Sequence, residues 1–338
     1  MNQLPRIGIT MGDPAGIGPE IILKALATRR PFAWCRPVIF GEPQLFQRLA
    51  KRLKLPLRFI LIDGDHGPGD APSSRVIPIV PIGKTRSVPT PGRLTKAGGR
   101  LAAQAIEQAT AWAQAGRLEA ITTGPIHKVG LARAGYPFEG HTEFLASLTG
   151  ASAVGMMMVG GGLRIMLATT HVSMRTLSQR LTTQKVLTAI QLTARALRDW
   201  FRRPGAPIGV TGLNPHAGDH GRFGDEEACV IVPAIRRARR LGINVSGPYP
   251  ADTLIRRAHQ GEFEAVVAMY HDQALIPIKL LAFGRAVNLT TGLPFVRTSV
   301  DHGTAYDIAG KGVADPGSLL EALELAATLA KRQRRIKD

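Results

Sequence analysis

The sequence predicts an α/β fold built on largely parallel sheets. Short apolar segments rich in Val and Ile alternate with longer segments of helical period, which is the pattern of strands joined by crossover helices. The candidate strands are apolar on both faces, as fully buried parallel strands are. Because the chain has 338 residues, more than a single core usually supports, we expect two domains.

The expected elements follow from these patterns. Strands are expected at residues 6–10, 37–40, 57–62, 120–123, 165–169, 208–212 and 265–270. The clearest helical segments span residues 95–115, 183–202, 225–241 and 316–332. Three glycines at 160–162 predict a hairpin turn. The segment 63–91, rich in Gly, Pro, Ser and Asp, predicts a surface loop around an edge strand at 76–80.

The composition excludes several classes of protein. Apolar residues make up 44% and charged residues 20% of the chain, as in ordinary globular proteins. No apolar run reaches the roughly 18 residues of a membrane span, and the N-terminus has no signal-peptide pattern. We therefore expect a cytoplasmic protein that makes no membrane contact. Cys35 and Cys229 lack metal-site spacing and are expected to be buried.

The formal net charge of +18 is the unusual total, and it raises the question of nucleic-acid binding. The excess lies in short basic groups at expected helix ends and solvated faces. Aromatic residues make up only 5% and do not interleave with these groups, although base stacking requires them. We expect no nucleic-acid partner, since a basic surface also attracts a small phosphorylated substrate.

Three histidines are placed where open α/β sheets bind ligands. His171, His216 and His271 each follow a predicted strand, and ligands gather outside the carboxyl ends of such strands. Three imidazoles delivered there could hold one divalent ion and leave a position open for substrate. Ordinary hydrogen-bonded histidines at strand ends are the alternative.

Two further segments carry candidate anion-binding groups. The stretch GHTEF begins a helix that is expected to end at Gly150. Thr142 as its N-cap would leave N–H groups and a hydroxyl for a phosphate. Lys279, Asn288 and Arg297 stand in a strongly apolar run and could clamp a phosphate or carboxylate. Surface salt bridges and simple helix capping are the alternatives.

The nucleotide motifs of common folds are absent from the sequence. The segment GDPAGIGPE follows the first strand but lacks the GxGxxG spacing of a Rossmann dinucleotide site. There is also no GxxxxGK[ST] and no HExxH, which disfavours P-loop enzymes and zinc proteases.

Eight segments together resemble the 4-hydroxythreonine-4-phosphate dehydrogenase family of vitamin B6 biosynthesis. In order they are GDPAGIGPE, ITTGPIHK, GHTEF, ATTHVSMR, GLNPHAGDHGRFGDEE, GPYPADT, MYHDQALIPIKLL and VNLTTGLPFVRTSVDHGTAYDIAGKG. The first segment and HGTAYDIAGKG also resemble isopropylmalate and isocitrate dehydrogenases. The resemblance implies a two-domain isopropylmalate-dehydrogenase-like fold with non-Rossmann nucleotide binding and an active site in the interdomain cleft. The expected domains are 1–130 plus 285–338 on the nucleotide side, and 131–284 for metal, substrate and dimerisation.

The resemblance also implies roles for individual residues. His171, His216 and His271 would bind one divalent metal, Zn, Mg or Co, at a site shared across a homodimer interface. The implied substrate contacts are His141, Thr142, Lys279, Asn288 and Arg297. His302 and Asp307 would lie near NAD or NADP. His220 stands where a small or acidic residue is usual in the family, and Asp252, Asp272 and Lys279 are the candidate proton acceptors.

The implied reaction is the NAD(P)-dependent oxidation of 4-(phosphooxy)-L-threonine to 2-amino-3-oxo-4-phosphooxybutanoate. That product would decarboxylate to 3-amino-2-oxopropyl phosphate in pyridoxal phosphate biosynthesis. Oxidation of D-threonate or D-erythronate 4-phosphate in sugar-acid catabolism is an alternative, and a dihydrodiol dicarboxylate is another. The last substrate lacks the phosphate that Lys279, Asn288 and Arg297 would bind, so it is disfavoured.

Overall fold

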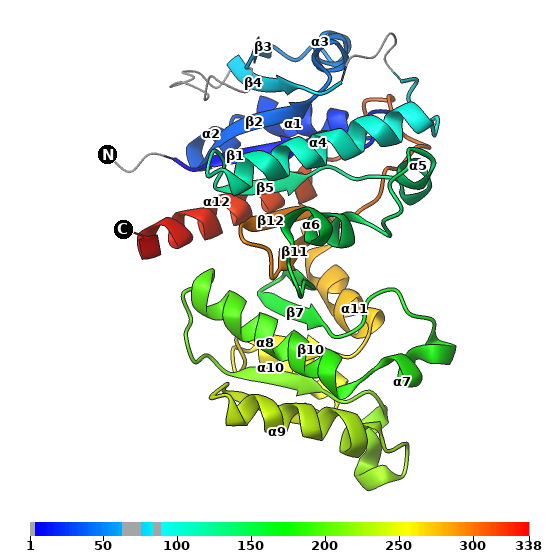
Figure 1. Cartoon of the computed structure of the whole chain (residues 1–338), viewed down its shortest axis with the longest axis vertical. Coiled ribbons are helices and arrows are strands. Elements are labelled where there is room, and N and C mark those ends of the chain that lie inside the picture. The colour runs from blue at the N-terminus through cyan, green and yellow to red at the C-terminus, as the bar shows by residue number, and fades with distance from the viewer. Residues whose placement is uncertain (1–3, 63–75, 84–88, 338) are drawn as a thin grey trace. The chain divides into compact units, whose positions relative to one another are not determined.

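The computed structural model describes residues 4–62, 76–83 and 89–337, and they form two compact units (Figure 1). The first unit comprises the described residues of Met1–Ala151 and Leu293–Ile336, and the second comprises Ser152–Gly292. These limits differ from the expected boundaries at 131 and 285. Helix α6 packs against α4 and so belongs to the first unit, whereas β11 pairs with β6 and so belongs to the second.

The first unit is a parallel sheet with helices. Its strands run in the order β3-β4-β2-β1-β5-β12, and all the strand pairs recorded within this unit are parallel. The strands are β1 (Arg6–Thr10), β2 (Arg36–Gly41), β3 (Arg58–Leu61), β4 (Val76–Pro81), β5 (Ala120–Thr123) and β12 (Val296–Val300). The helices are α1 (Gly18–Ala27), α2 (Pro31–Trp34), α3 (Pro43–Arg52), α4 (Lys96–Gln114), α5 (Lys128–Arg133), α6 (His141–Thr149) and α12 (Gly317–Lys337).

Local sequence accounts for the long helix α4 of this unit. Thr95 is its N-cap, and the Thr95 hydroxyl accepts a hydrogen bond from the Gly98 N–H, as capping residues do. Leu101, Ile106 and Trp112 are buried, and the helix packs on β1, β2 and β5 (Figure 1). The apolar side of this helix therefore faces the core of the unit.

The second unit is a mixed sheet with the strand order β11-β6-β7-β10-β8-β9. The pairs β11–β6 and β6–β7 are antiparallel, and the pairs from β7 to β9 are parallel. The strands are β6 (Gly155–Gly160), β7 (Leu163–Leu167), β8 (Ile208–Thr211), β9 (Val245–Tyr249), β10 (Ala265–Ala268) and β11 (Val287–Thr291). The helices are η1 (Met174–Thr176), α7 (Leu177–Arg180), α8 (Thr183–Asp199), η2 (Pro215–Gly221), η3 (Glu227–Ile231), α9 (Val232–Arg240), α10 (Ala251–His259) and α11 (His271–Ala282).

Helices cover both faces of the parallel part of this sheet. One core cluster joins Ile165 and Val266 to Leu254 of α10 and Ile278 of α11. Since neighbouring residues of a strand point to opposite faces, Met166 faces the other side, where α8 packs on β7 and β10 (Figure 1). The strands of this region are therefore buried on both faces, as their continuous apolar sequences predicted.

Most expected elements are confirmed, with shifts at their ends. Each expected strand has an observed counterpart, and the glycines at 161 and 162 form the β6–β7 turn with φ of 57° and 79°. The expected helix 225–241 is divided, because a π-helical turn at Glu227–Ile231 precedes α9. The strand expected at 76–80 is β4, but it pairs with both β3 and β2, so the expectation of an edge strand was wrong. Residues 63–75 and 84–88 of the expected surface loop lie outside the described residues.

Two further observations concern the composition. No helix among the described residues is long and apolar enough to cross a membrane. Cys35 is buried, as expected, and burial raises the pKa of its thiol to about 12. The expectation was wrong for Cys229, which is exposed and has its Sγ 3.5 Å from an oxygen of Asp225.

Candidate active site

Three histidines follow three neighbouring parallel strands of the second unit. His171 follows β7, His271 follows β10 and His216 follows β8, and the order β7-β10-β8 places these strands side by side. The ends of β7 and β10 are tied together, because the Thr169 hydroxyl donates to the Met269 carbonyl over 2.7 Å. The histidines thus leave the sheet at its carboxyl edge, where open α/β sheets bind ligands.

Two of these imidazoles lie close together. The ring centroids of His171 and His271 are 5.9 Å apart. The Nδ1 atom of His271 lies 2.8 Å from an oxygen of the Asp272 carboxylate, which orients the ring and leaves Nε2 for another ligand. Histidines that bind metals usually have such a carboxylate behind them. The donor chemistry of this pair therefore fits a divalent cation.

His216 stands apart from the pair. It is exposed, and its ring centroid lies 6.2 Å from that of Phe223. Over the described parts of the chain, no three His, Cys, Asp or Glu side chains gather at metal-binding spacing. His220 is also exposed and lies on the same loop. The single chain therefore presents two adjacent imidazoles and a third on a separate loop.

Gln273 is a polar residue that the sequence patterns did not assign to the site. Its Oε1 accepts hydrogen bonds from the Met269 N–H at 2.8 Å and the Thr211 hydroxyl at 2.9 Å. Its Nε2 donates to the Gly212 carbonyl over 2.8 Å. Gln273 thus connects the turn that carries His271 to the end of β8. One feature of the sequence could have indicated this role: Gln273 is an amide in a largely apolar segment, two residues after the strand-end histidine His271.

The first unit holds Arg297 in its core. The residue lies on β12 opposite Ile121 of β5 and is 1% exposed. Its Nη2 donates to the Thr123 hydroxyl over 2.5 Å, at the carboxyl end of β5. Since charged side chains are rarely buried so fully unless they are paired or bind a ligand, this environment suits an arginine that binds an anion.

Helix α6 begins near this arginine. The positive charge of Arg297 is close enough to lower the pKa of His141, and the negative charge of Glu143 is close enough to raise the pKa of Arg297. The helix N-cap is Gly140, so the prediction that Thr142 caps the helix was wrong, and Thr142 lies in the first turn. Nε2 of His141 is buried and has no hydrogen-bond partner among the described residues, which leaves it available to a ligand.

Burial sets the charge states of the cluster formed by Arg297 and His141. It lowers the pKa of His141 well below its ordinary value, and the positive charge of Arg297 lowers it further, against a hydrogen bond with the Gly124 backbone. Burial also lowers the pKa of Arg297 to about 9, against the opposing charge of Glu143. At neutral pH the cluster therefore combines a charged guanidinium with a neutral imidazole.

The other predicted polar residues lie in the second unit. Lys279 is exposed in the last turn of α11, the helix that begins at His271. Asn288 lies on β11, and its Oδ1 is buried without a hydrogen-bond partner among the described residues. Asp252 is exposed in the first turn of α10. Asp272 contacts His271, so it orients that ring.

His302 and Asp307, which were expected to lie near the nucleotide, are on the segment between β12 and α12. His302 Nε2 is buried with no partner in the described chain, whereas Asp307 is exposed. The Tyr306 hydroxyl donates to Asp13 over 2.7 Å, and the Tyr306 ring stacks on His127. The GDPAG loop is therefore bound to the segment that carries His302, and the buried nitrogen suits a polar ligand.

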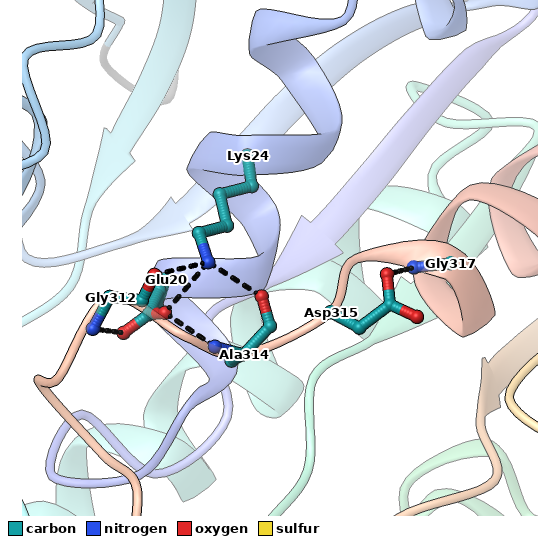
Figure 2. A network of polar contacts seen from close by, with 6 residues as sticks. All are labelled: Glu20, Lys24, Gly312, Ala314, Asp315 and Gly317. Atoms are coloured by element: carbon teal, nitrogen blue, oxygen red, sulfur yellow. Dashed lines mark hydrogen bonds and ion pairs between the residues drawn. The ribbon is translucent and has the colours of Figure 1, made fainter.

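A second contact fixes the end of the same segment (Figure 2). Glu20 of α1 is 1% exposed, and its carboxylate accepts the N–H groups of Gly312 at 3.2 Å and Ala314 at 2.9 Å. Lys24 lies 3.1 Å from this carboxylate and donates to the carbonyls of the same two residues. The first helix thus holds the backbone at the end of the HGTAYDIAGKG sequence and just after it.

The α/β fold, the histidines at the strand ends and the buried arginine suit an enzyme that acts on a small anionic substrate, and the similarity to the dehydrogenases reported next identifies an oxidoreductase that acts on a secondary alcohol. The chain belongs to the family described as pyridoxal phosphate biosynthetic protein PdxA, whose model matches residues 33–326.

Relatives and solved structures agree with this family. A 4-hydroxythreonine-4-phosphate dehydrogenase from Desulforapulum autotrophicum is 44% identical over 332 residues, which cover 96% of either chain. A D-threonate 4-phosphate dehydrogenase from Cupriavidus necator is 44% identical over 337 residues, 98% of this chain and 99% of its own. The crystal structure of the 4-hydroxythreonine-4-phosphate dehydrogenase from Klebsiella pneumoniae matches with a TM-score of 0.89 and 41% identity, covering 96% and 99% of the two chains.

Proposed function

We propose that this chain oxidises 4-(phosphooxy)-L-threonine with NAD or NADP in pyridoxal phosphate biosynthesis. The product would be 2-amino-3-oxo-4-phosphooxybutanoate, a β-keto acid that loses carbon dioxide to give 3-amino-2-oxopropyl phosphate. The observation that supports this most directly is the nearly full-length similarity to dehydrogenases of that substrate, at 44% identity. The buried Arg297 supports a phosphorylated substrate.

The residues have distinct roles in this proposal. Arg297, His141 and Thr142 bind the substrate's phosphate, which places an anion beside a buried guanidinium and an imidazole nitrogen that has no partner in the described parts of the chain. Lys279 and Asn288 contribute further polar contacts to the substrate. His302 and Asp307 contact the nucleotide. This division assigns a ligand to three buried atoms that have no hydrogen-bond partner among the described residues, His141 Nε2, Asn288 Oδ1 and His302 Nε2.

His171, His216 and His271 would hold one divalent ion, Zn, Mg or Co. When bound, that ion would polarise the substrate hydroxyl, and the nicotinamide would accept the hydride. The hydroxyl proton passes to a side chain of the protein. Since Asp272 is already engaged with His271, it serves as a positioning residue, and Asp252 and Lys279 remain the candidate acceptors.

We also propose a homodimer in which both copies contribute to each metal site. A single chain brings only His171 and His271 together. Helix α11, which starts at His271, leaves apolar side chains uncovered: Ile276 is 65% exposed and Leu280 is 83% exposed. A second copy would cover this face. Mixing two inactive variants, altered at His216 and at His271, should restore part of the activity, whereas a fully active monomer in light scattering would contradict the proposal.

Oxidation of D-threonate 4-phosphate or D-erythronate 4-phosphate is the second candidate function. A D-threonate 4-phosphate dehydrogenase is also 44% identical to this chain, and it shares the phosphate that Arg297 would bind. A cytoplasmic location and the absence of nucleic-acid and membrane partners stay predictions.

The test is a substrate comparison. The purified protein is incubated with NAD or NADP, a divalent metal, and either 4-(phosphooxy)-L-threonine or D-threonate 4-phosphate, while NADH or NADPH absorbance is recorded. A kcat/KM for the aminated substrate at least about tenfold higher, equivalent to about 1.4 kcal/mol in transition-state binding, supports the main proposal. The reverse preference supports the second candidate. Activity on neither substrate would reject the main proposal and the oxidation of D-threonate 4-phosphate.

A further inference from the structure

The loop that carries His216 has an unusual backbone. Residues 216–220 all have positive φ, between 42° and 83°, so five consecutive residues are left-handed. Only Gly218 among them lacks a side chain that opposes this conformation. Such a backbone persists only where the surrounding structure holds it, and it is concentrated at functional sites.

Glu227 holds the start of this loop. Its Oε1 accepts two backbone hydrogen bonds, from the N–H groups of Leu213 and Asn214, each at 2.8 Å. Its Oε2 accepts a third from the Asn214 side-chain amide at 3.0 Å. Glu227 is 6% exposed. Hydrogen bonds to a charged acceptor are stronger than neutral ones, so this carboxylate is a rigid anchor for the chain just before His216.

Glycines allow the carboxylate to lie against the loop. A Cβ atom at Gly218 would stand 2.7 Å from Glu227 Oε2, and one at Gly212 would stand 3.0 Å from Oε1. Gly221 has a similar positive φ of 92°, yet a Cβ there would lie more than 4 Å from every described residue outside its own neighbours. The Glu227 carboxylate therefore packs directly on the left-handed turn at 216–220, in addition to binding Leu213 and Asn214 before the turn.

We propose that Glu227 is a positioning residue that holds the 213–220 loop in the conformation that presents His216 to a divalent cation. This inference rests on the proposed role of His216 as a metal ligand. Glu227 contacts the backbone before and within the turn and acts through it, so it does not itself bind the metal. Its sequence position, in the helical segment after the loop, gave no indication of this role.

The main test is Glu227→Gln, measured by calorimetric titration of the full-length, metal-free protein with Zn²⁺. The amide keeps the size of the side chain but loses the charge and one acceptor oxygen. We expect Zn²⁺ affinity to fall about tenfold or more, in the range for residues that orient ligands. Glu226→Gln is the matched control, because Glu226 contacts only the Asn214 side chain in this loop, and its effect should stay below about threefold.

Combination with His216→Ala separates the two proposals. If Glu227 acts through His216, adding Glu227→Gln to His216→Ala should cause no further loss of Zn²⁺ affinity. Unchanged affinity in His216→Ala alone would reject the metal role of His216. A normal affinity in Glu227→Gln, together with a loss in His216→Ala, would reject only the role of Glu227. A full additional loss in the double variant would also reject it.

A second pair of variants guards against misfolding of Glu227→Gln. Gly218→Ala introduces the 2.7 Å clash with Glu227, whereas Gly221→Ala introduces similar backbone strain without a clash. We expect Gly218→Ala to lower Zn²⁺ affinity and to speed amide hydrogen exchange at 213–220, and Gly221→Ala to do neither to the same degree. Equal effects of the two substitutions would contradict the proposed packing.

Discussion

The imidazole rings of His171 and His271 lie 5.9 Å apart, centroid to centroid, at the carboxyl ends of the adjacent strands β7 and β10. The pairing of these strands brings the two rings together, since the hydrogen bond between Thr169 and Met269 joins the chain just before them. Asp272 then orients one of the rings. This relationship is the basis of the first prediction.

Replacing His171, His216 or His271 by Ala should remove bound metal and lower kcat/KM by more than about 100-fold, beyond the range for outer partners. Metal content by emission spectroscopy and NADH production measure the two effects. His220→Ala is the control, because His220 lies exposed on the same loop as His216, and it should keep both properties. Full metal content and turnover in two of the three variants would reject the proposed triad.

Arg297→Lys should weaken use of the phosphate. Lysine keeps the charge but loses the planar fork, one arm of which donates to Thr123. We expect a loss on the order of 1 to 3 kcal/mol in transition-state binding, about 5-fold to 150-fold in kcat/KM. The loss should largely vanish when wild type and variant are compared on the dephosphorylated substrate. An equal penalty on both substrates would show that Arg297 has a structural role or binds the carboxylate.

The stability of the protein should depend on pH through His141. Burial and the charge of Arg297 lower the pKa of His141 in the folded protein below its ordinary value of 6.5. Below pH 6.5 the unfolded chain therefore binds more protons than the folded protein does. The contribution of neutral, buried His141 to the free energy of unfolding is therefore complete above about pH 6.5 and is lost as the pH falls. When the pH is lowered from 7.5 to 5.5, the free energy of unfolding should fall by on the order of 1 kcal/mol more in the wild type than in His141→Gln. Denaturant unfolding at both pH values measures this difference, and parallel losses would refute it.

Glu20→Gln should loosen residues 312–314, at the end of the segment that we propose contacts the nucleotide. Glu20 is buried and accepts two backbone N–H groups while it pairs with Lys24 (Figure 2). We expect a loss of about 1 to 3 kcal/mol in unfolding free energy, with a higher KM for NAD and little change in kcat. Glu324→Gln is the control, because that residue makes a surface ion pair with Arg30, which is worth less than about 1 kcal/mol. An unchanged KM for NAD in Glu20→Gln would contradict the prediction.

The sequence by itself determined the α/β class and the location of the main strands. Apolar runs such as AVVA of β10 form strands where they were predicted, because burial on both faces favours apolar residues along the whole strand. It also determined which histidines follow strands. The strands β6, β9, β11 and β12 were not predicted, since their Gly, Pro and polar residues obscure the apolar pattern.

Tertiary structure decided which of these residues meet. Whether His171 lies beside His271 or His216 depends on the order β7-β10-β8, which pairs segments distant in the sequence. Local pattern likewise could not show that Glu227 holds a left-handed turn at 216–220, because the hydrogen bonds involved cross from a helix to a loop. The sequence identified the candidate site side chains, but not their positions relative to one another. Those positions follow from burial and hydrogen bonding between segments that only the folded chain brings together.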